Sequence, residues 1–144
     1  MTAIEVADKL ARYFEGLFLR PYICSAGYRT VGFGHLYPKG GAITEKQAVA
    51  FLQSDLTIAL LGAIRQCPGL VARQEALGAI TDFCFNLGVG RLQASTLKRR
   101  INQQDWEGAR KELNRWVYAG GRKLKGLVAR RAAETRFLPQ TMVN

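Results

Sequence analysis

The sequence predicts an α+β fold, in which helices and strands occupy separate parts of a 144-residue chain. Two observations predict it. Residues 17–40 are rich in aromatic, β-branched and glycine residues, which is typical of a small antiparallel sheet with tight turns. The segments on both sides repeat apolar residues at helical spacing. We therefore expect a single domain with a small β-lobe at about 16–42, a connecting helix and a mainly helical lobe at about 67–144, with a cleft between the lobes.

The first element is a helix over residues 3–14, whose apolar residues recur every three or four positions. Thr2 or a neighbouring residue is the expected N-cap. The helix should end near Glu15 and Gly16, because glycine suits a helix terminus. Its apolar positions are Ile4, Ala7, Leu10, Ala11 and Phe14.

Past the predicted sheet, residues 37–41 form a loop, and Thr44 with Gln47 makes a capping-box pattern. This pattern opens a connecting helix that should run to about Gln66, since Pro68 then interrupts the chain. The remainder of the chain is predicted to be helical, with glycine-containing breaks at residues 86–90 and 119–121. The expected helices are 74–86, 91–101, 105–117 and 126–137.

The chain is strongly basic, with 21 Lys and Arg against 11 Asp and Glu and a formal net charge of +10. Such a charge attracts polyanions, which include nucleic acids, anionic lipids and anionic cell walls, and it does not choose among them. A solvated, solubilising helix face is the alternative interpretation of the basic clusters. These clusters contain Lys98, Arg99, Arg100, Arg122, Lys123, Lys125, Arg130 and Arg131.

The three cysteines, Cys24, Cys67 and Cys84, are odd in number and fit no metal-binding spacing. We expect all three to be reduced, with a Cys67–Cys84 disulfide as the less favoured alternative. The first sixteen residues lack the basic and apolar regions of a signal peptide, which predicts accumulation in the cytoplasm. The longest apolar stretch, 59–64, is expected to be too short to span a bilayer.

Glu15 is the strongest candidate for an acid catalyst, because it follows an apolar helix and is flanked by Phe14 and Leu17. Apolar neighbours disfavour the charged form of a carboxyl group, and a general acid must carry its proton. An ordinary exposed glutamate at a helix end is the alternative interpretation. The residues that follow favour the catalytic one.

Cys24 lies nine residues after Glu15, and Thr30 lies six residues further on and begins the run Thr-Val-Gly-Phe-Gly-His. This segment resembles the active site of the phage lysozyme family, in which a catalytic Glu, an Asp and a Thr have this spacing. Two later segments resemble the mid-chain and C-terminal signatures of that family. They are Phe85 to Gly90 with Ser95 to Leu97, and Trp116 with Gly120, Gly121, Gly126, Leu127, Arg130, Arg131 and Glu134.

The resemblance implies a lysozyme-like catalytic domain over residues 1–144 that acts as an endolysin without a cofactor or metal. Its activity would be hydrolysis of the bond between N-acetylmuramic acid and N-acetylglucosamine in bacterial peptidoglycan, which lyses the host cell. Glu15 would protonate the leaving oxygen, and Thr30 would position the attacking water. The implied substrate-binding residues are Gly34, Leu36, Phe85 and Asn86.

Cys24 departs from the family pattern, because it occupies the position of the usual Asp. A thiolate there could act as a base, stabilise the positively charged transition state, or attack the sugar carbon directly, and the last would change the stereochemical outcome. An inert apolar filler is the remaining alternative. The resemblance also implies that His35 pairs with Asp55, joining the β-lobe to the connecting helix. That pairing is favoured over a metal site or a Cys24–His35 nucleophile pair.

Two other functions stay open. A lytic transglycosylase on the same substrate needs only one acidic residue, so this function stays open in a chain that lacks the usual Asp. A basic, non-catalytic module that binds the wall or nucleic acid would explain the charge but not Glu15. The expected protein is a monomer that binds peptidoglycan, does not bind nucleic acid or insert stably into membranes, and reaches the wall from the host cytoplasm through a holin.

Overall fold

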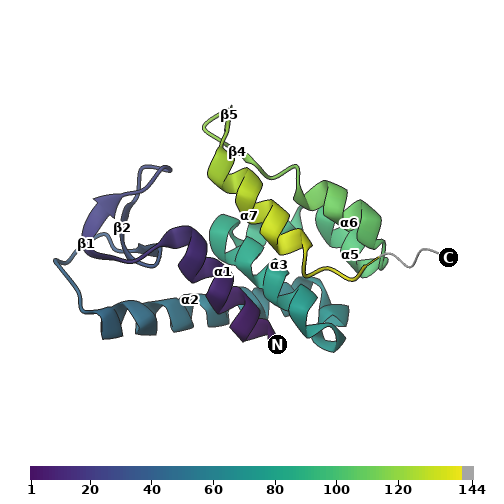
Figure 1. The fold of residues 1–144 in the computed structure, drawn as a ribbon, viewed down its shortest axis with the longest axis horizontal. Coiled ribbons are helices and arrows are strands. Elements are labelled where there is room, and N and C mark those ends of the chain that lie inside the picture. The colour runs from purple at the N-terminus through teal and green to yellow at the C-terminus, as the bar shows by residue number, and fades with distance from the viewer. Residues whose placement is uncertain (141–144) are drawn as a thin grey trace.

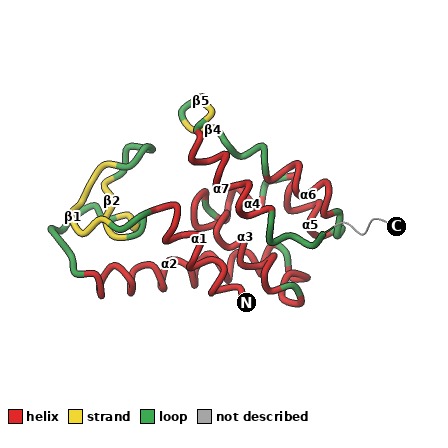
Figure 2. The backbone as a smooth tube through the Cα atoms, viewed as in Figure 1, coloured by secondary structure: helices red, strands yellow, loops and turns green. Residues whose placement is uncertain are grey.

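The computed structural model describes residues 1–140 and shows two lobes, with the strands of the larger sheet confined to one of them (Figures 1 and 2). The expected α+β fold class, with strands and helices in separate lobes, is confirmed. The small lobe holds strands β1 (Phe18–Ile23), β2 (Arg29–Gly32) and β3 (His35–Leu36). The helical lobe holds the short η1 (Pro68–Ala72), α3 (Gln74–Leu87), α4 (Val89–Gln93), α5 (Thr96–Asn102), α6 (Trp106–Leu113) and α7 (Lys125–Thr135).

Helix α1 (Ala3–Glu15) leads into the β-lobe but packs mainly against α3 of the helical lobe. The Thr2 side chain caps it by accepting a hydrogen bond from the Glu5 N–H, as the sequence predicts. At its other end Gly16 has a φ of +70°, a conformation that favours glycine and turns the chain toward β1. Glu15 is therefore the last residue of a helix whose inner face is buried.

The three strands form one antiparallel sheet in the order β1-β2-β3. Thr30 is the cross-strand partner of both Tyr22 and Leu36, so these three residues share one face of the sheet. Val31 points to the opposite face and is fully buried. It belongs to a core cluster between the sheet, α1 and α2, which also contains Ala7, Ala11, Phe33, Ile43, Ala48, Leu52 and Leu56.

Helix α2 (Glu45–Gln66) connects the lobes, and the capping box predicted from Thr44 and Gln47 is present. By length and composition alone α2 is long and apolar enough to cross a membrane, and its most apolar window has a mean hydropathy of 1.4. The helix packs against α3, α1 and β2, and it buries Leu52, Leu56 and Ala63 in the core. Its apolar residues thus serve the junction of the two lobes.

The helical lobe differs from the sequence prediction in two places. The helix expected over 91–101 is two helices, because the Ser95 hydroxyl accepts a hydrogen bond from the Lys98 N–H and starts α5 anew. The helix expected over 105–117 ends at Leu113, and an unforeseen hairpin follows, made of β4 (Tyr118–Ala119) and β5 (Arg122–Lys123). The two glycines between these strands have positive φ angles, which favours a tight turn.

Candidate active site

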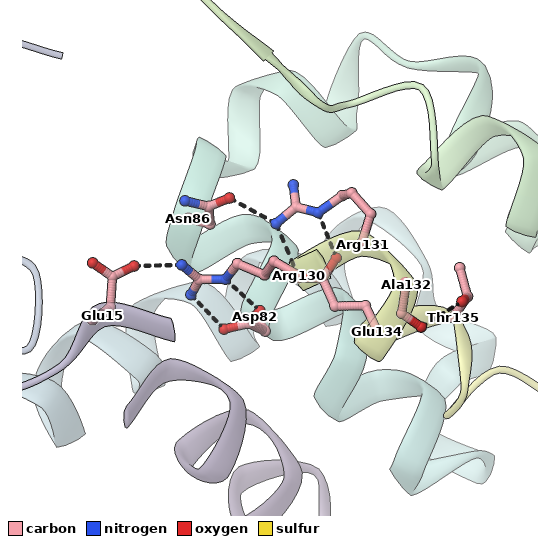
Figure 3. A network of polar contacts seen from close by, with 8 residues as sticks. All are labelled: Glu15, Asp82, Asn86, Arg130, Arg131, Ala132, Glu134 and Thr135. Carbon is pink, nitrogen blue, oxygen red and sulfur yellow. Dashed lines mark hydrogen bonds and ion pairs between the residues drawn. The ribbon is translucent and has the colours of Figure 1, made fainter. Parts of the chain in front are cut away.

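Glu15 lies at the junction of the two lobes, where the end of α1 meets α7 and the β-lobe. Its side chain is 19% exposed, and its Oε2 accepts a short 2.5 Å hydrogen bond from Arg130 Nη1 (Figure 3). Arg130 comes from α7, so the contact links residues 115 positions apart. The surroundings of Glu15 are therefore not only apolar, as expected, because the buried guanidinium of Arg130 contacts its carboxyl group.

Gly34 approaches Glu15 from the β-lobe. A Cβ atom at Gly34 would lie 2.5 Å from Glu15 Oε1 and 2.8 Å from Cδ, and the φ angle of Gly34 is +73°. Both the space and the backbone conformation therefore require glycine. Gly34, an expected substrate-binding residue, therefore lies directly against the carboxyl group of Glu15 in this structure.

A buried polar network holds Arg130 from the side opposite Glu15 (Figure 3). Arg130 Nε and Nη2 donate to the two carboxylate oxygens of Asp82, at 2.9 Å and 2.7 Å. Asp82 is fully buried in α3, and Arg130 is 3% exposed. Burial raises the pKa of Asp82, but hydrogen bonding and the charge of Arg130 outweigh this and hold its pKa below the usual value. Asp82 is therefore a carboxylate.

Arg131 and Glu134 extend this network deeper into the helical lobe. Arg131 Nη2 donates to Asn86 Oδ1 at 2.6 Å and to Glu134 Oε2 at 3.2 Å. Arg131 Nε also lies 2.8 Å from Glu134 Oε1, but these two atoms do not meet hydrogen-bond geometry. The expected substrate residue Asn86 thus has its amide oxygen directed toward Arg131, within the protein.

Cys24 follows β1 in the tight turn that leads to β2 and is partly exposed. Its backbone N–H donates to Tyr28 O at 2.9 Å, and its own carbonyl accepts from the Gly27 N–H at 2.8 Å. Desolvation raises the pKa of the thiol, but hydrogen bonds from the Tyr28 backbone and the Thr30 side chain, with weaker ones from the turn, bring that pKa below its ordinary value. The turn therefore makes the thiolate form of Cys24 easier to reach than in a free cysteine.

Thr30 lies on β2 and is 2% exposed. Its hydroxyl is 2.9 Å from the Tyr28 carbonyl oxygen, to which it donates, and it also contributes to lowering the pKa of Cys24. The hydroxyl of Thr30 therefore lies beside the thiol. This proximity follows from the tight turn between β1 and β2.

Tyr22 is a residue of this site that the sequence prediction missed. Its phenol pKa is raised by burial, and further by the negative charges of Glu15 and Cys24, so its hydroxyl lies within electrostatic reach of both. Tyr22 is the cross-strand partner of Thr30 and precedes Cys24 by two residues. Because side chains on a strand alternate faces, this two-residue spacing is the signal that could have identified it.

A cavity of about 290 Å³ lies beside Gly34 and includes three of the four expected substrate-binding residues, Gly34, Leu36 and Phe85. Leu36 is 59% exposed, and Phe85 reaches the cavity from α3. The rest of the lining is His35, Asp55, Ile58, Ala59, Cys84, Gly88 and Val89. A second hollow of about 360 Å³ on the α5–α6 surface is lined mostly by charged side chains and shares none of the residues discussed here.

The expected pairing of His35 with Asp55 is confirmed, since His35 Nδ1 lies 2.7 Å from Asp55 Oδ2. The His35 ring also stacks on Phe51 of α2, with the ring centres 4.1 Å apart. Both contacts tie β3 to α2 next to the cavity. Within residues 1–140, no three His, Cys, Asp or Glu side chains gather closely enough to hold a metal ion.

Solved structures similar to this one include an endolysin and a muramidase domain. The endolysin of Escherichia coli O157:H7 phage FAHEc1 superposes with a TM-score of 0.80 at 25% identity, over 96% of this chain and 93% of that one. The muramidase domain of SpmX from Asticaccaulis excentricus superposes with a TM-score of 0.78 at 26% identity, over 98% and 100%. The fold and the carboxyl group at its lobe junction thus define a lysozyme-like glycoside hydrolase.

The sequence comparisons narrow this class. Residues 12–134 match the model of the phage lysozyme family, so the chain belongs to that family. The SAR-endolysin of Bacteriophage PS119 is 39% identical over 83% of this chain and 73% of its own length. The endolysin of Acyrthosiphon pisum secondary endosymbiont phage 1 is 38% identical over 87% and 89%. The chain is therefore a peptidoglycan-hydrolysing lysozyme of the endolysin type, and the two alternative functions are not favoured.

Proposed function

We propose that this lysozyme cleaves the bond between N-acetylmuramic acid and N-acetylglucosamine with Glu15 as the general acid. The observation that carries the proposal is the position of Glu15 at the lobe junction, with Oε2 held by Arg130 and Oε1 facing Gly34 at the edge of the cavity. Glu15 protonates the glycosidic oxygen as the bond to the anomeric carbon breaks.

Cys24 acts in this proposal as a thiolate that takes a proton from the attacking water, and the hydroxyl of Thr30 orients that water. The lowered pKa of the Cys24 thiol supports this role. Hydrolysis by water on the opposite face of the sugar would invert the anomeric configuration. If Cys24 instead attacked the carbon, the product would retain that configuration, so NMR of the first-formed anomer distinguishes the two roles.

The cavity lined by Gly34, Leu36 and Phe85 binds the sugars in this proposal, with the Phe85 ring available to an apolar sugar face. Asn86 contributes through Arg131, to which its amide oxygen is bonded, and its amide nitrogen remains a candidate substrate donor. Residues 1–144 form one catalytic domain that works as a monomer without a cofactor.

The net charge of +10 attracts the enzyme to the anionic wall, and membership of the phage lysozyme family favours the wall over nucleic acid or stable insertion into a membrane. The proposed route is accumulation in the host cytoplasm and release to the wall through a holin. Two measurements test these points: sedimentation of the pure protein, which should show a monomer, and lysis timing in cells that express the chain with and without a holin.

The central experiment compares the parent enzyme with Glu15→Gln on outer-membrane-permeabilised bacteria. General acid catalysis contributes about 10²–10⁴-fold, so lysis by Glu15→Gln should fall by at least that order while its unfolding curve stays close to that of the parent. Mass analysis of the released muropeptides should show reducing ends. Full activity of Glu15→Gln would remove the assignment, and anhydro-muramyl ends would identify a transglycosylase.

A further inference from the structure

We propose that Asp82 is a positioning residue for the general acid: by fixing Arg130, it sets which oxygen of Glu15 is held and which is left to react. The inference rests on the proposed role of Glu15. Asp82 itself lies behind Arg130, fully buried in α3, and acts only through that side chain (Figure 3).

The geometry at Arg130 leaves it little freedom. A guanidinium is planar and presents its N–H groups in a fixed fork. Two arms of the fork, Nε and Nη2, are taken by the two oxygens of Asp82, which leaves Nη1 directed at Glu15. The rings of Phe14 and Phe85 lie 5.6 Å and 5.9 Å from the guanidinium carbon. Asp82 therefore determines where Nη1 points.

The two oxygens of Glu15 are made unequal by this arrangement. Oε2 accepts the hydrogen bond from Arg130, whereas Oε1 takes part in no hydrogen bond within the described chain and faces Gly34. A proton on the carboxyl group is thus favoured on Oε1, because Oε2 is already used as an acceptor. Gly34, which Oε1 faces, also lines the cavity, so Oε1 is the oxygen of Glu15 on the side of the proposed sugar site.

Titratable groups from both lobes surround the ion pair of Arg130 and Glu15. Burial raises the pKa of Glu134 well above its usual value, and its carboxyl group hydrogen-bonds to Asp82. The cations Arg130 and Arg131 thus lie against three carboxyl groups, those of Asp82, Glu15 and Glu134. On the β-lobe side, Tyr22 is the titratable group whose pKa is raised by burial and further by the charge of Glu15.

The test is a cycle of three variants, Asp82→Asn, Arg130→Gln and the double variant, assayed on a soluble peptidoglycan oligomer. Asp82→Asn keeps one oxygen but places an amide N–H₂ against an Arg130 donor. We expect kcat to fall about 10- to 100-fold, because a displacement on the order of 1 Å at the reacting group costs up to about 10²-fold. KM should change by less than about threefold, since the substrate-binding cavity is untouched.

The double variant makes the outcome decisive. If Asp82 acts through Arg130, Asp82→Asn should reduce kcat no further once Arg130 is Gln. The double variant also replaces both members of the buried Asp82–Arg130 pair by neutral side chains, so neither of the two is left as a buried charge without its partner, even if the single variants fold poorly. Additive losses in the double variant, or a parental kcat for Asp82→Asn, would overturn the inference.

Two further variants separate this inference from loss of stability and from the proposed function. Leu77→Ala removes a buried side chain from the same helix, so it should lower the melting temperature but leave kcat per folded molecule unchanged. Glu15→Gln reports on the proposed function alone. An inactive Glu15→Gln together with a fully active Asp82→Asn refutes only the role of Asp82, whereas an active Glu15→Gln removes both.

Discussion

Replacing Gly34 by Ala should disable the enzyme by moving its proposed acid. The added methyl group would lie 2.5 Å from Glu15 Oε1 and 2.8 Å from Cδ, whereas ordinary carbon contacts begin at about 3.5 Å. The carboxyl group must therefore shift by about 1 Å, which also disturbs the hydrogen bond from Arg130. A shift of this size costs about 10²-fold in kcat, so we expect a loss of that order.

A change at Gly34 also strains the backbone, and this contribution needs its own control. The φ angle of +73° costs a non-glycine residue about 1–2 kcal/mol. Gly121 offers a matched position, because its φ is +75° and nothing lies within 4 Å of an added Cβ. Gly121→Ala should therefore lose similar stability in urea unfolding but keep its turbidity activity. A Gly34→Ala enzyme as active as Gly121→Ala would refute the reasoning.

Three more predictions follow from the site. Cys24→Asp should remain active and shift the rising limb of the pH–rate profile to lower pH, because the pKa of Asp is about 3.9 and lies below the lowered pKa of the Cys24 thiol. If the rising limb stayed at the same pH, Cys24 would not be the base. Glu134→Gln should flatten the pH dependence of the free energy of unfolding in urea. Because the folded-state pKa of Glu134 is raised, its contribution to stability is full below the unfolded pKa of about 4.3 and declines as the pH rises toward the folded pKa. The same pH dependence in both proteins would contradict this expectation. Asp55→Ala should lower the free energy of unfolding by about 1 kcal/mol through loss of the His35 contact, whereas exposed Ser54→Ala should change it by less than about 0.5 kcal/mol.

Local signals in the sequence predicted most of the elements. The Thr44 capping box and the apolar spacing of residues 3–14 each fix a helix from residues close together in the chain, and both helices were found as expected. The break before α5 was missed because Ser95 was assigned to a helix interior, where a serine is tolerated, rather than to a cap. The β4–β5 hairpin was missed because its strands have only two residues each.

The candidate site was predictable only in part, for a physical reason. Glu15, Cys24 and Thr30 lie close together in the sequence, so their spacing carried the information. The partners that hold Glu15 come from distant segments: Arg130 is 115 residues away, and Asp82 meets Arg130 across 48 residues. No local pattern specifies which carboxylates converge on a given arginine, because that choice depends on how α1, α3 and α7 pack.

The three cysteines differ enough in burial and in thiol pKa that a thiol reagent should modify one of them selectively. Cys67 and Cys84 are buried, which raises their thiol pKa values to about 11 and about 12, while Cys24 is partly exposed with a lowered pKa. Since thiol reagents react with thiolates, the native protein should present one fast site and two silent ones. A fluorophore could therefore be attached at Cys24 without altering the sequence, and its emission would report on the surroundings of the turn between β1 and β2.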